Sequence, residues 1–453
     1  MSFPRYPSYK DSGVEWLGDV PEGWRVIRMG MLEKSGDDFV SGPFGSSLGS
    51  SRYVENGIPV IRGLNTTLNA EARFVPEDFV FVGEETFVEL KRCDARPGDV
   101  VFTARGTVGK VGVVPDSIPK ALISPNQLRY RPDLEALSVD YLFYLFSSSG
   151  LLSEIGLVAD SVAQPNLNLG NLKALRVSLP PKSEQTQIAA FLDSETAKID
   201  ELVAEQRRLM ELLKEKRQAV ISHAVTKGLN PDAPMKPSGI EWLGNVSAHW
   251  AVVPLKHLCV LLKDGTHLPP ERVDDGIPLL SVRNLVDGEF VLREDDSLIS
   301  EESYQDLSRA FVPKAEDVLL AIVGATLGKT AVIPSGLGPF HIQRSVAIFR
   351  TKPDVLRSGF LNLVFQSSSF QALLWELVGY SAQPGIYLGT LQNIRIPVPP
   401  LNEQTRILES ISSVANELTG LTAEAQRAID LLQERRTALI SAAVTGQIDV
   451  RPH

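Results

Sequence analysis

The chain has 453 residues, of which 43% are hydrophobic and 22% are charged, and its formal net charge at pH 7 is -10. This length predicts two or more domains, each with a core of its own, and the composition excludes a disordered chain. The acidity argues mildly against nucleic-acid binding, but it does not exclude it, because binding depends on the local distribution of charge.

The location of the protein is suggested by what the sequence lacks. It has no run of about 18 apolar residues that could span a membrane, and residues 1–6 do not resemble the apolar core of a signal peptide. The two cysteines, Cys93 and Cys259, are far apart in the sequence. This spacing fits a reducing compartment and argues against a zinc site or a disulfide framework. We therefore expect a cytoplasmic protein with no membrane partner.

Internal repetition is the clearest feature of the sequence. Leu-Pro-Pro-x-x-Glu-Gln-Thr at 179–186 returns as Val-Pro-Pro-x-x-Glu-Gln-Thr at 398–405, a shift of 219 residues (398 minus 179). Further copies relate 163–165 (Ala-Gln-Pro) to 382–384, and 12–18 (Ser-Gly-Val-Glu-Trp-Leu-Gly) to 238–244. A repeat of this length indicates two related halves rather than a solenoid.

A long helix is predicted after each Pro-Pro pair. Ser183 is suited to cap the first helix, and apolar residues then recur in alternating steps of four and three from Ile188 to Val220, which is coiled-coil spacing. The second copy repeats this phase from Ile407 to Leu439. Each stripe alone would expose a long apolar surface, so we favour two helices that pack on each other, antiparallel. The alternative is two independent helices, each lying on its own globular part.

Short β-branched and aromatic runs fill the globular part of each half. They predict strands at 58–61, 99–103, 111–114, 277–280 and 317–323, and short helices at 140–146, 151–155 and 360–365. The fold class is therefore α+β, with two mixed α/β domains separated by two long helices and a pseudo-twofold internal repeat. The expected segments are 1–182 (first domain), 183–228 (central helix), 229–401 (linker and second domain) and 402–453 (distal helix).

One segment resembles a phosphate-binding loop. Gly324-Ala-Thr-Leu-Gly-Lys-Thr330 is one residue shorter than a Walker A loop, and its counterpart at 106–110 is followed by Val111 instead of Ser or Thr. We favour a turn that connects two strands over a nucleotide-binding loop. A third possibility is a loop whose lysine contacts a nucleic-acid phosphate. The six histidines show no metal-ligand spacing, and no methyltransferase or serine-hydrolase motif occurs. We expect no catalytic residue and no metal site.

The ordered, duplicated motifs resemble those of one family, the specificity (S) subunits of type I restriction–modification systems. The resemblance is carried by Pro180–Thr186 and Pro399–Thr405 before the helices, and by the openings 15–24 and 241–250. It covers essentially the whole chain. One departure is Val246-Ser-Ala-His-Trp250, where the first half has the tighter turn Pro21-Glu-Gly-Trp24.

The resemblance implies a non-catalytic DNA-recognition subunit. Two target-recognition domains would each read one half of an interrupted double-stranded DNA site. The helices would form an antiparallel coiled coil that sets the spacing. They would also dock two methyltransferase (M) subunits and, through the complex, restriction (R) subunits. S-adenosylmethionine, ATP and magnesium are expected on these partners and no cofactor in this chain. The alternatives are a two-module protein-binding scaffold without DNA contact and a fused methyltransferase or nuclease.

Residues that read DNA should be polar donors on turn-bounded loops, because base edges are discriminated by such side chains. The Ser/Gly-rich loop 41–53 stands out in the first half. The candidates for DNA contact are Ser46, Ser47, Arg52, Arg62, Asn65, Arg105, Lys110, Asn126 and Gln127, followed by Thr266, His267, Arg283, Asn284, Lys329, Gln343 and Arg344. For each, the alternative is a solvated surface residue or a structural turn residue. Alanine at Arg52 or Arg283 is expected to weaken specific binding.

Overall fold

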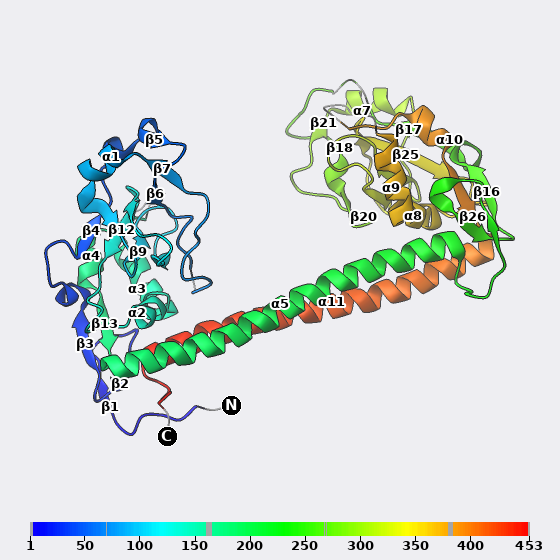
Figure 1. Ribbon diagram of the computed structural model, residues 1–453. Helices are drawn as coiled ribbons and strands as arrows, with labels where there is room; N and C mark the ends of the chain where they lie inside the picture. The colour runs from blue at the N-terminus through cyan, green and yellow to red at the C-terminus, as the bar shows by residue number, and fades with distance from the viewer. Residues whose placement is uncertain are drawn as a thin grey trace. The chain divides into compact units, whose positions relative to one another are not determined.

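The structure, a computed structural model, describes residues 3–68, 70–159, 165–266, 268, 270–378 and 384–451. The chain forms two compact units (Figure 1). Unit 1 comprises Met1–Gln206 with Arg427–His453, and unit 2 comprises Arg207–Gln426. This division differs from the four expected segments, because each long helix is shared between the two units instead of forming a segment of its own.

Both long helices begin directly after the Pro-Pro pairs, so Ser183 lies inside the first turn of its helix and is not the cap that the sequence predicts. Helix α5 spans Lys182–Lys227 and helix α11 spans Leu401–Val444. Gly228 follows α5 with a φ of 84°, and Gly446 follows α11 with a φ of 74°. Glycine tolerates this left-handed conformation, which ends a helix. The distal helix is therefore shorter than the predicted 402–453, because Gly446 ends it and the following residues leave the helix.

The predicted apolar seam is only partly buried. Ile188 and Leu192 are buried, but Leu202 and Leu209 are 43% and 41% exposed, and Val203, which lies outside the seam, is buried. A helix with 3.6 residues per turn drifts away from a strict 3.5-residue repeat. The buried stripe therefore changes phase along α5, and the regular seam expected from the sequence is wrong at these positions.

Unit 1 contains two main sheets. The four-stranded antiparallel sheet has the order β10-β9-β12-β4, and the five-stranded sheet has the order β5-β7-β6-β11-β8, in which β6 and β11 are parallel. The strands are β1 (Tyr9–Asp11), β2 (Asp19–Pro21), β3 (Arg25–Arg28), β4 (Phe39–Ser41), β5 (Tyr53–Val54), β6 (Ile58–Ile61), β7 (Val80–Val82), β8 (Asp94–Ala95), β9 (Val100–Thr103), β10 (Val111–Val113), β11 (Ala121–Ile123), β12 (Gln127–Tyr130) and β13 (Arg176–Leu179). The helices besides α5 and α11 are α1 (Glu84–Glu89), α2 (Val139–Phe146), α3 (Ser149–Val158) and α4 (Leu169–Ala174), with 3-10 turns at Met29–Leu32, Gly45–Leu48, Ser50–Arg52 and Lys91–Cys93.

Unit 2 repeats the four-stranded sheet, but its second sheet has three strands in the order β21-β18-β24 instead of five. Its four-stranded sheet has the order β23-β22-β25-β17, and β18 pairs in parallel with β24 as β6 does with β11. The strands are β14 (Met235–Pro237), β15 (Asn245–Ser247), β16 (Ala251–Pro254), β17 (Cys259–Asp264), β18 (Ile277–Leu280), β19 (Leu285–Val286), β20 (Glu289–Phe290), β21 (Leu298–Ile299), β22 (Val318–Ala321), β23 (Thr330–Val332), β24 (His341–Ile342), β25 (Val346–Thr351) and β26 (Arg395–Val398). The helices are α6 (Leu255–Leu258), α7 (Glu301–Ser308), α8 (Ser358–Gln366), α9 (Ser368–Leu377) and α10 (Leu388–Asn393), with 3-10 turns at Glu241–Leu243 and Val282–Asn284.

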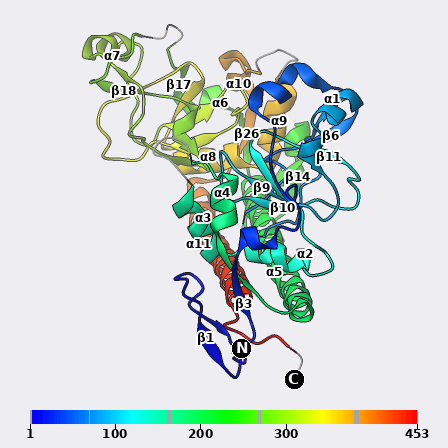
Figure 2. The ribbon, with the colours of Figure 1, turned by 90° about the vertical axis from the view of Figure 1, so that its left-hand side faces the viewer.

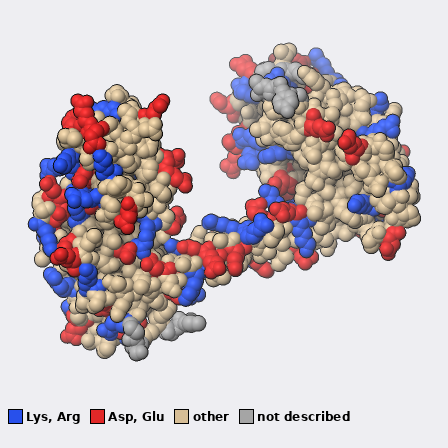
Figure 3. Space-filling view, viewed as in Figure 1, with Lys and Arg blue, Asp and Glu red and all other residues tan. Residues whose placement is uncertain are grey.

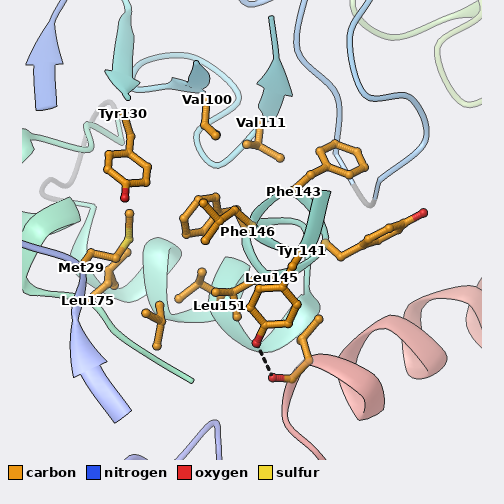
Figure 4. Packing of buried hydrophobic residues seen from close by; sticks show 14 of the residues in the cluster. Met29, Val100, Val111, Tyr130, Tyr141, Phe143, Leu145, Phe146, Leu151 and Leu175 are labelled. Atoms are coloured by element: carbon orange, nitrogen blue, oxygen red, sulfur yellow. Dashed lines mark hydrogen bonds between the residues drawn. The ribbon is translucent and has the colours of Figure 1, made fainter. Parts of the chain in front are cut away.

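The largest core cluster of each unit includes the start of one long helix and the end of the other. In unit 1, the core contains Ile188 of α5 and Ile440 of α11 together with α2, whose side chains from Tyr141 to Phe146 are all buried. Figure 4 shows Phe146 facing the strand residues of the sheet and Tyr141 bonded toward α11, where its hydroxyl donates to the carbonyl of Val444 at 3.4 Å. In unit 2, α11 begins and α5 ends in the equivalent core.

The glutamate of the repeated motif ties the start of each long helix to a buried tryptophan. Glu184 accepts hydrogen bonds from the Tyr6 hydroxyl (2.6 Å) and the Trp24 indole (3.1 Å). Glu403 accepts one from the Trp250 indole, also at 3.1 Å. Burial, and then the bond to Glu184, raise the pKa of Tyr6. The same hydrogen bond between a glutamate and a tryptophan therefore occurs in both units, which accounts for the repetition of both residues in the sequence.

The glutamine of the motif connects each long helix to the next short one. Gln185 donates to the carbonyl of Pro180 (2.9 Å) and accepts from the backbone N–H of Ser138, the N-cap of α2 (2.9 Å). Gln404 donates to the carbonyl of Pro399 (2.8 Å) and accepts from the N–H of Arg357, the N-cap of α8 (2.8 Å). Both glutamine side chains are buried, so their amides need these partners inside the protein.

The two ends of the described chain lie side by side in unit 1 (Figures 1 and 2). The N–H of Asp449 donates to the carbonyl of Pro4 at 2.8 Å. Among the described residues, no single helix is long and apolar enough to cross a bilayer, and the bent pair α2–α3 passes that test only when taken together. Basic and acidic side chains are interspersed on the visible face of each unit (Figure 3).

Candidate nucleic-acid interface

Five backbone segments of unit 1 line a cavity of about 620 Å³. They lie within residues 39–47 at the start of the Ser/Gly loop, 89–93 after α1, 104–105 after β9, 125–128 at β12, and 166–169 before α4, and we call them site 1. Among the predicted contacts, Ser47, Arg105, Asn126 and Gln127 line this cavity. Segments that are far apart in the sequence therefore bring four of the candidates together.

The Ser/Gly loop is fixed at both ends. At its start, the N–H of Gly42 donates to the carbonyl of Gln127 at 2.8 Å. A Cβ atom on Gly42 would lie 1.9 Å from the carbonyl oxygen of Ser124, so only glycine fits there. At its other end, Leu48 is buried in a core cluster. The residues between these anchors, including Ser46, are mostly exposed.

Arg105 is the best-placed cation of site 1. It is exposed, its Nε donates to the side-chain oxygen of Asn166 at 3.2 Å, and the two residues also form a backbone bridge. No carboxylate of a described residue lies within 4.0 Å of its guanidinium. The remaining N–H groups of Arg105 are thus free of ion pairs in the described part of the chain and can donate to a guanine edge or a phosphate.

The other basic candidates of unit 1 are engaged within the unit. Arg52 forms a 2.6 Å ion pair with Glu89, and the bond from Arg52 lowers the pKa of that carboxyl group. Arg62 donates to the carbonyl of Asp78. Lys110 lies 3.5 Å from the carbonyl of Gly63, at the limit of a hydrogen bond. Arg52 and Arg62 would have to give up these contacts in order to meet DNA.

Two polar candidates of unit 1 are buried, which differs from the exposed position expected. Asn65 donates to the carbonyls of Val75 and Glu77 at 2.8 and 2.9 Å. Gln127 lies within 3.2 Å of the Thr103 hydroxyl. Their amides hold neighbouring loops together, because a buried amide must find partners inside the protein. We therefore reassign both residues from contact to support.

Unit 2 builds an equivalent site from residues 265–266, 322–324, 342–345 and 385–387, which we call site 2. Thr266 bridges Gln343, and Val323 bridges Gly385 as Arg105 bridges Asn166. A Cβ atom on Gly265 would lie 2.2 Å from the carbonyl oxygen of Ile342, the same restriction found at Gly42. The backbone is thus repeated between the sites while the side chains differ.

Arg344 is the exposed cation of site 2, as Arg105 is of site 1. Its N–H donates to the carbonyl of Thr266 at 3.1 Å, and no described carboxylate lies within 4.0 Å of its side chain. Gln343 is partly exposed beside it. His267, which follows Thr266, lies outside the described residues. Site 2 therefore combines a hydroxyl, an amide and a guanidinium.

Arg283 and Asn284 stand apart from site 2. Arg283 is paired with Asp295 and lies 3.5 Å from Asp296. Asn284 is buried, completes a capping box with Ser281, and donates to Asp296 at 2.8 Å. Asn284 therefore differs from the exposed position expected, and we reassign it to support of the β18–β19 turn.

The glycine-lysine segment 324–330 connects the antiparallel strands β22 and β23. The N–H of Gly328 donates to the carbonyl of Ala321 at 2.9 Å, and Gly324 and Gly328 both have a φ of 88°. A Walker A loop leads into a helix, whereas this segment leads into a strand. The strand-connecting turn is therefore the correct interpretation. Lys329 lines a separate cavity of about 760 Å³ beside Lys214 and Arg217 of α5.

Sequence reasoning missed residues whose position depends on the fold. Asn166 orients Arg105, and Phe44 lies on the rim of site 1 with 88% of its surface exposed. In site 2 the exposed ring is that of Tyr387, at 84%. The repeated Ala-Gln-Pro segment directly before Asn166 was the available signal. Within the described ranges, no group of three or more His, Cys, Asp or Glu residues could hold a metal ion.

Comparison with known proteins gives one consistent family. Residues 49–210 and 248–430 match the family model of the type I restriction modification DNA specificity domain. The chain is 24% identical over 447 residues to the type I restriction enzyme MjaVIII specificity subunit of Methanocaldococcus jannaschii. The aligned region covers 95% of this chain and 94% of that protein. The chain is 26% identical over 450 residues to the EcoBI specificity subunit of Escherichia coli, covering 97% and 89%.

Solved structures share the fold over nearly the full length. A chain from a structure that concerns complex assembly and conformational transition of the type I R-M system matches with a TM-score of 0.64 and 19% identity, covering 94% of this chain and 98% of that one. The HsdS subunit from Thermoanaerobacter tengcongensis matches with a TM-score of 0.50 and 18% identity, with the same coverage. Mixed helix and strand in two specificity-domain regions is therefore the fold of this group.

Proposed function

The chain belongs to the family of type I restriction modification DNA specificity proteins, and on this premise we propose that its two units each read one half of an interrupted DNA site. As a specificity subunit it supplies sequence recognition to a restriction–modification complex. The observation that carries the proposal is the repeated backbone of sites 1 and 2, which holds unlike side chains. Arg105 with Asn126, and Thr266 with Arg344, present different donor patterns, as two different base sequences require.

We further propose that α5 and α11 form an antiparallel coiled coil, related by a pseudo-twofold axis, that fixes the distance between half-sites. The start of one helix and the end of the other share a core in each unit, which supports this arrangement. Two recognition modules on a rigid connection meet a duplex at a spacing that follows from the length of the connection.

The proposed partners are double-stranded DNA, two methyltransferase (M) subunits and, through the complex, restriction (R) subunits. The duplicated glutamate and glutamine contacts at the helix starts support two equivalent docking faces for two identical partners. We assign catalysis to these partners, together with S-adenosylmethionine, ATP and magnesium, and propose that this chain is non-catalytic and binds no cofactor. The names of its relatives, all specificity subunits, support this assignment.

Mapping of methylated adenines in host DNA tests the proposed function. With this chain present, methylation should occur at one interrupted sequence, and deletion of the chain should remove it. Replacement of site 1 alone should change one half-site and leave the other half-site unchanged. Methylation that is indifferent to the chain would favour a protein-binding scaffold without DNA contact.

The spacing role has its own test. Seven residues inserted after both Gln206 and Gln426, where the two units meet along the sequence, lengthen each helix by about 10 Å. The unread interval between half-sites should grow by about three base pairs, at 3.4 Å each. Methylation of the original site at the original spacing would contradict the role of the helices in spacing.

A further inference from the structure

We propose that Phe44 stacks on a base at one step of the first half-site and acts there as an aromatic wedge. This inference rests on the proposed function, because it names the contact through which site 1 would deform or grip the DNA it reads. Phe44 lies on the rim of the cavity with 88% of its surface exposed. Exposure of a whole aromatic side chain leaves apolar surface in water, and an occupant that covers the ring would gain the free energy of burying it.

The backbone holds Phe44 outward before any ligand arrives. Pro43, directly before it, is buried and has a fixed φ. Phe44 itself has an extended conformation (φ -59°, ψ 144°), and its carbonyl accepts the N–H of Ser47 at 2.8 Å. With Gly42 and Leu48 anchored, the ring is presented on a fixed base. Only its two side-chain torsions remain to be restricted on binding, which keeps the entropic cost low.

The surroundings of the ring indicate a nucleobase rather than an apolar protein surface. The cavity lining beside Phe44 combines apolar residues such as Leu90 and Leu169 and the carboxylate of Glu89 with the donors of Arg92, Arg105, Asn126 and Asn166. An apolar partner would desolvate these donors without giving them acceptors. A base offers both a face for stacking and an edge with acceptors, and the adjacent phosphates match the guanidinium of Arg105. Apolar side chains that enter a base step work in this way, next to cationic neighbours.

The experiment uses the full chain assembled with its methyltransferase subunits, without S-adenosylmethionine. The probe is a duplex with the interrupted site found by methylation mapping, and 2-aminopurine replaces each non-methylated adenine of the first half-site in turn. We expect the wild-type complex to raise the fluorescence at one position, because the analogue brightens when it is unstacked. Phe44→Ala should abolish that rise and weaken specific binding about 5- to 100-fold. Phe44→Trp should retain both.

The controls separate the inference from the proposed function. Leu134→Ala removes another exposed apolar side chain (52% exposed) outside the cavity, and it should bind and fluoresce as the wild type does. Unchanged binding and fluorescence with Phe44→Ala would overturn the wedge. So would weaker binding with no fluorescence rise at any position of the wild-type complex, because Phe44 would then contact a groove edge. A wild-type complex that does not distinguish the site from a scrambled duplex would overturn the proposed function itself.

Discussion

The two units are most alike where the long helices begin and least alike around sites 1 and 2. At the helix starts, Glu184 and Glu403 each accept from a buried indole at 3.1 Å, and the adjacent glutamines make matching bonds. Around the sites, Gly42 and Gly265 impose the same backbone restriction, but Arg105 stands where unit 2 has Val323. Residues that hold the backbone are thus duplicated, and residues that face outward from it have diverged.

Recognition can therefore change without a change of the backbone that supports it. The bonds of Gln185 and Gln404 are satisfied inside each unit, so they restrict no side chain of the sites. Conversely, the exposed guanidinium groups of Arg105 and Arg344 make few internal contacts, so their replacement costs the fold little. Paired substitutions in the two units test whether the helix starts and the sites differ in this way.

The largest effect is expected from the restricted glycines. Gly42→Ala and Gly265→Ala should each displace a loop, because the new Cβ would meet a carbonyl oxygen at 1.9 and 2.2 Å. Several contacts would shift together, so specific binding should fall about 100-fold, or about 2.8 kcal/mol. Gel-shift titration of the assembled complex measures this loss. Gly36→Ala and Gly338→Ala are matched controls, since a Cβ there meets nothing within 4 Å. Equal losses in the controls would refute the role of the two contacts.

Both duplicated glutamines should contribute to stability, and Gln404 more than Gln185, because its amide also donates to the carbonyl of Val355 at 2.9 Å. Gln185→Ala and Gln404→Ala each leave a buried carbonyl and a backbone N–H without a partner, which should lower the free energy of unfolding by about 2–3 kcal/mol. Hydrogen exchange of peptides from each unit measures the loss separately. Gln433→Ala, an exposed position on α11, is the control. A loss confined to one unit would break the equivalence of the two helix starts.

The exposed arginines should matter more than the paired ones. Arg105→Ala and Arg344→Ala should weaken specific binding about 10-fold, because each guanidinium is free of described ion pairs. Arg52→Ala and Arg283→Ala should have a smaller effect, since these side chains must first leave Glu89 and Asp295. Titration at one salt concentration compares all four. A larger loss at Arg52 than at Arg105 would reverse this ranking.

The smallest effect is a pH dependence confined to unit 2. His341 is buried, and burial lowers its pKa, whereas Leu122 has the equivalent place in the parallel pair of unit 1. At a pH above about 6.5, the pKa of a histidine in the unfolded chain, the ring is neutral in both the folded and the unfolded state. Its burial then costs unit 2 no stability through protonation. As the pH falls below that value, the unfolded chain binds the proton first. Unit 2 should then lose at most about 1.4 kcal/mol per pH unit.

Hydrogen exchange of unit 2 between pH 7.5 and 5.5 measures this loss, with unit 1 as the internal reference. His341→Leu should remove the histidine contribution and bring the pH dependence of unit 2 closer to that of unit 1. An unaltered pH dependence in His341→Leu would mean that another group is responsible.

Local sequence patterns were enough to predict many helices and strands. The environment of the site residues depends on contacts between residues that are far apart in the sequence. The strand predicted at 58–61 is β6, and the helix predicted at 360–365 lies within α8, because burial periodicity and turn residues are local signals. The burial of Asn65 could not be predicted, because its partners Val75 and Glu77 approach only after the loop closes. The same holds for Arg52, whose partner Glu89 is 37 residues away.

The way the chain is divided has a consequence for its synthesis. Unit 2 is one continuous stretch, Arg207–Gln426, whereas unit 1 also needs Arg427–His453. On the ribosome, unit 2 can therefore complete its core while unit 1, although it is translated first, still lacks the end of α11. The carbonyl of Val444 accepts the hydroxyl of Ser178 at 2.7 Å, so a bond inside the first unit is made only when the last residues emerge. A nascent chain cut short near its end would carry a finished second unit and an unfinished first one.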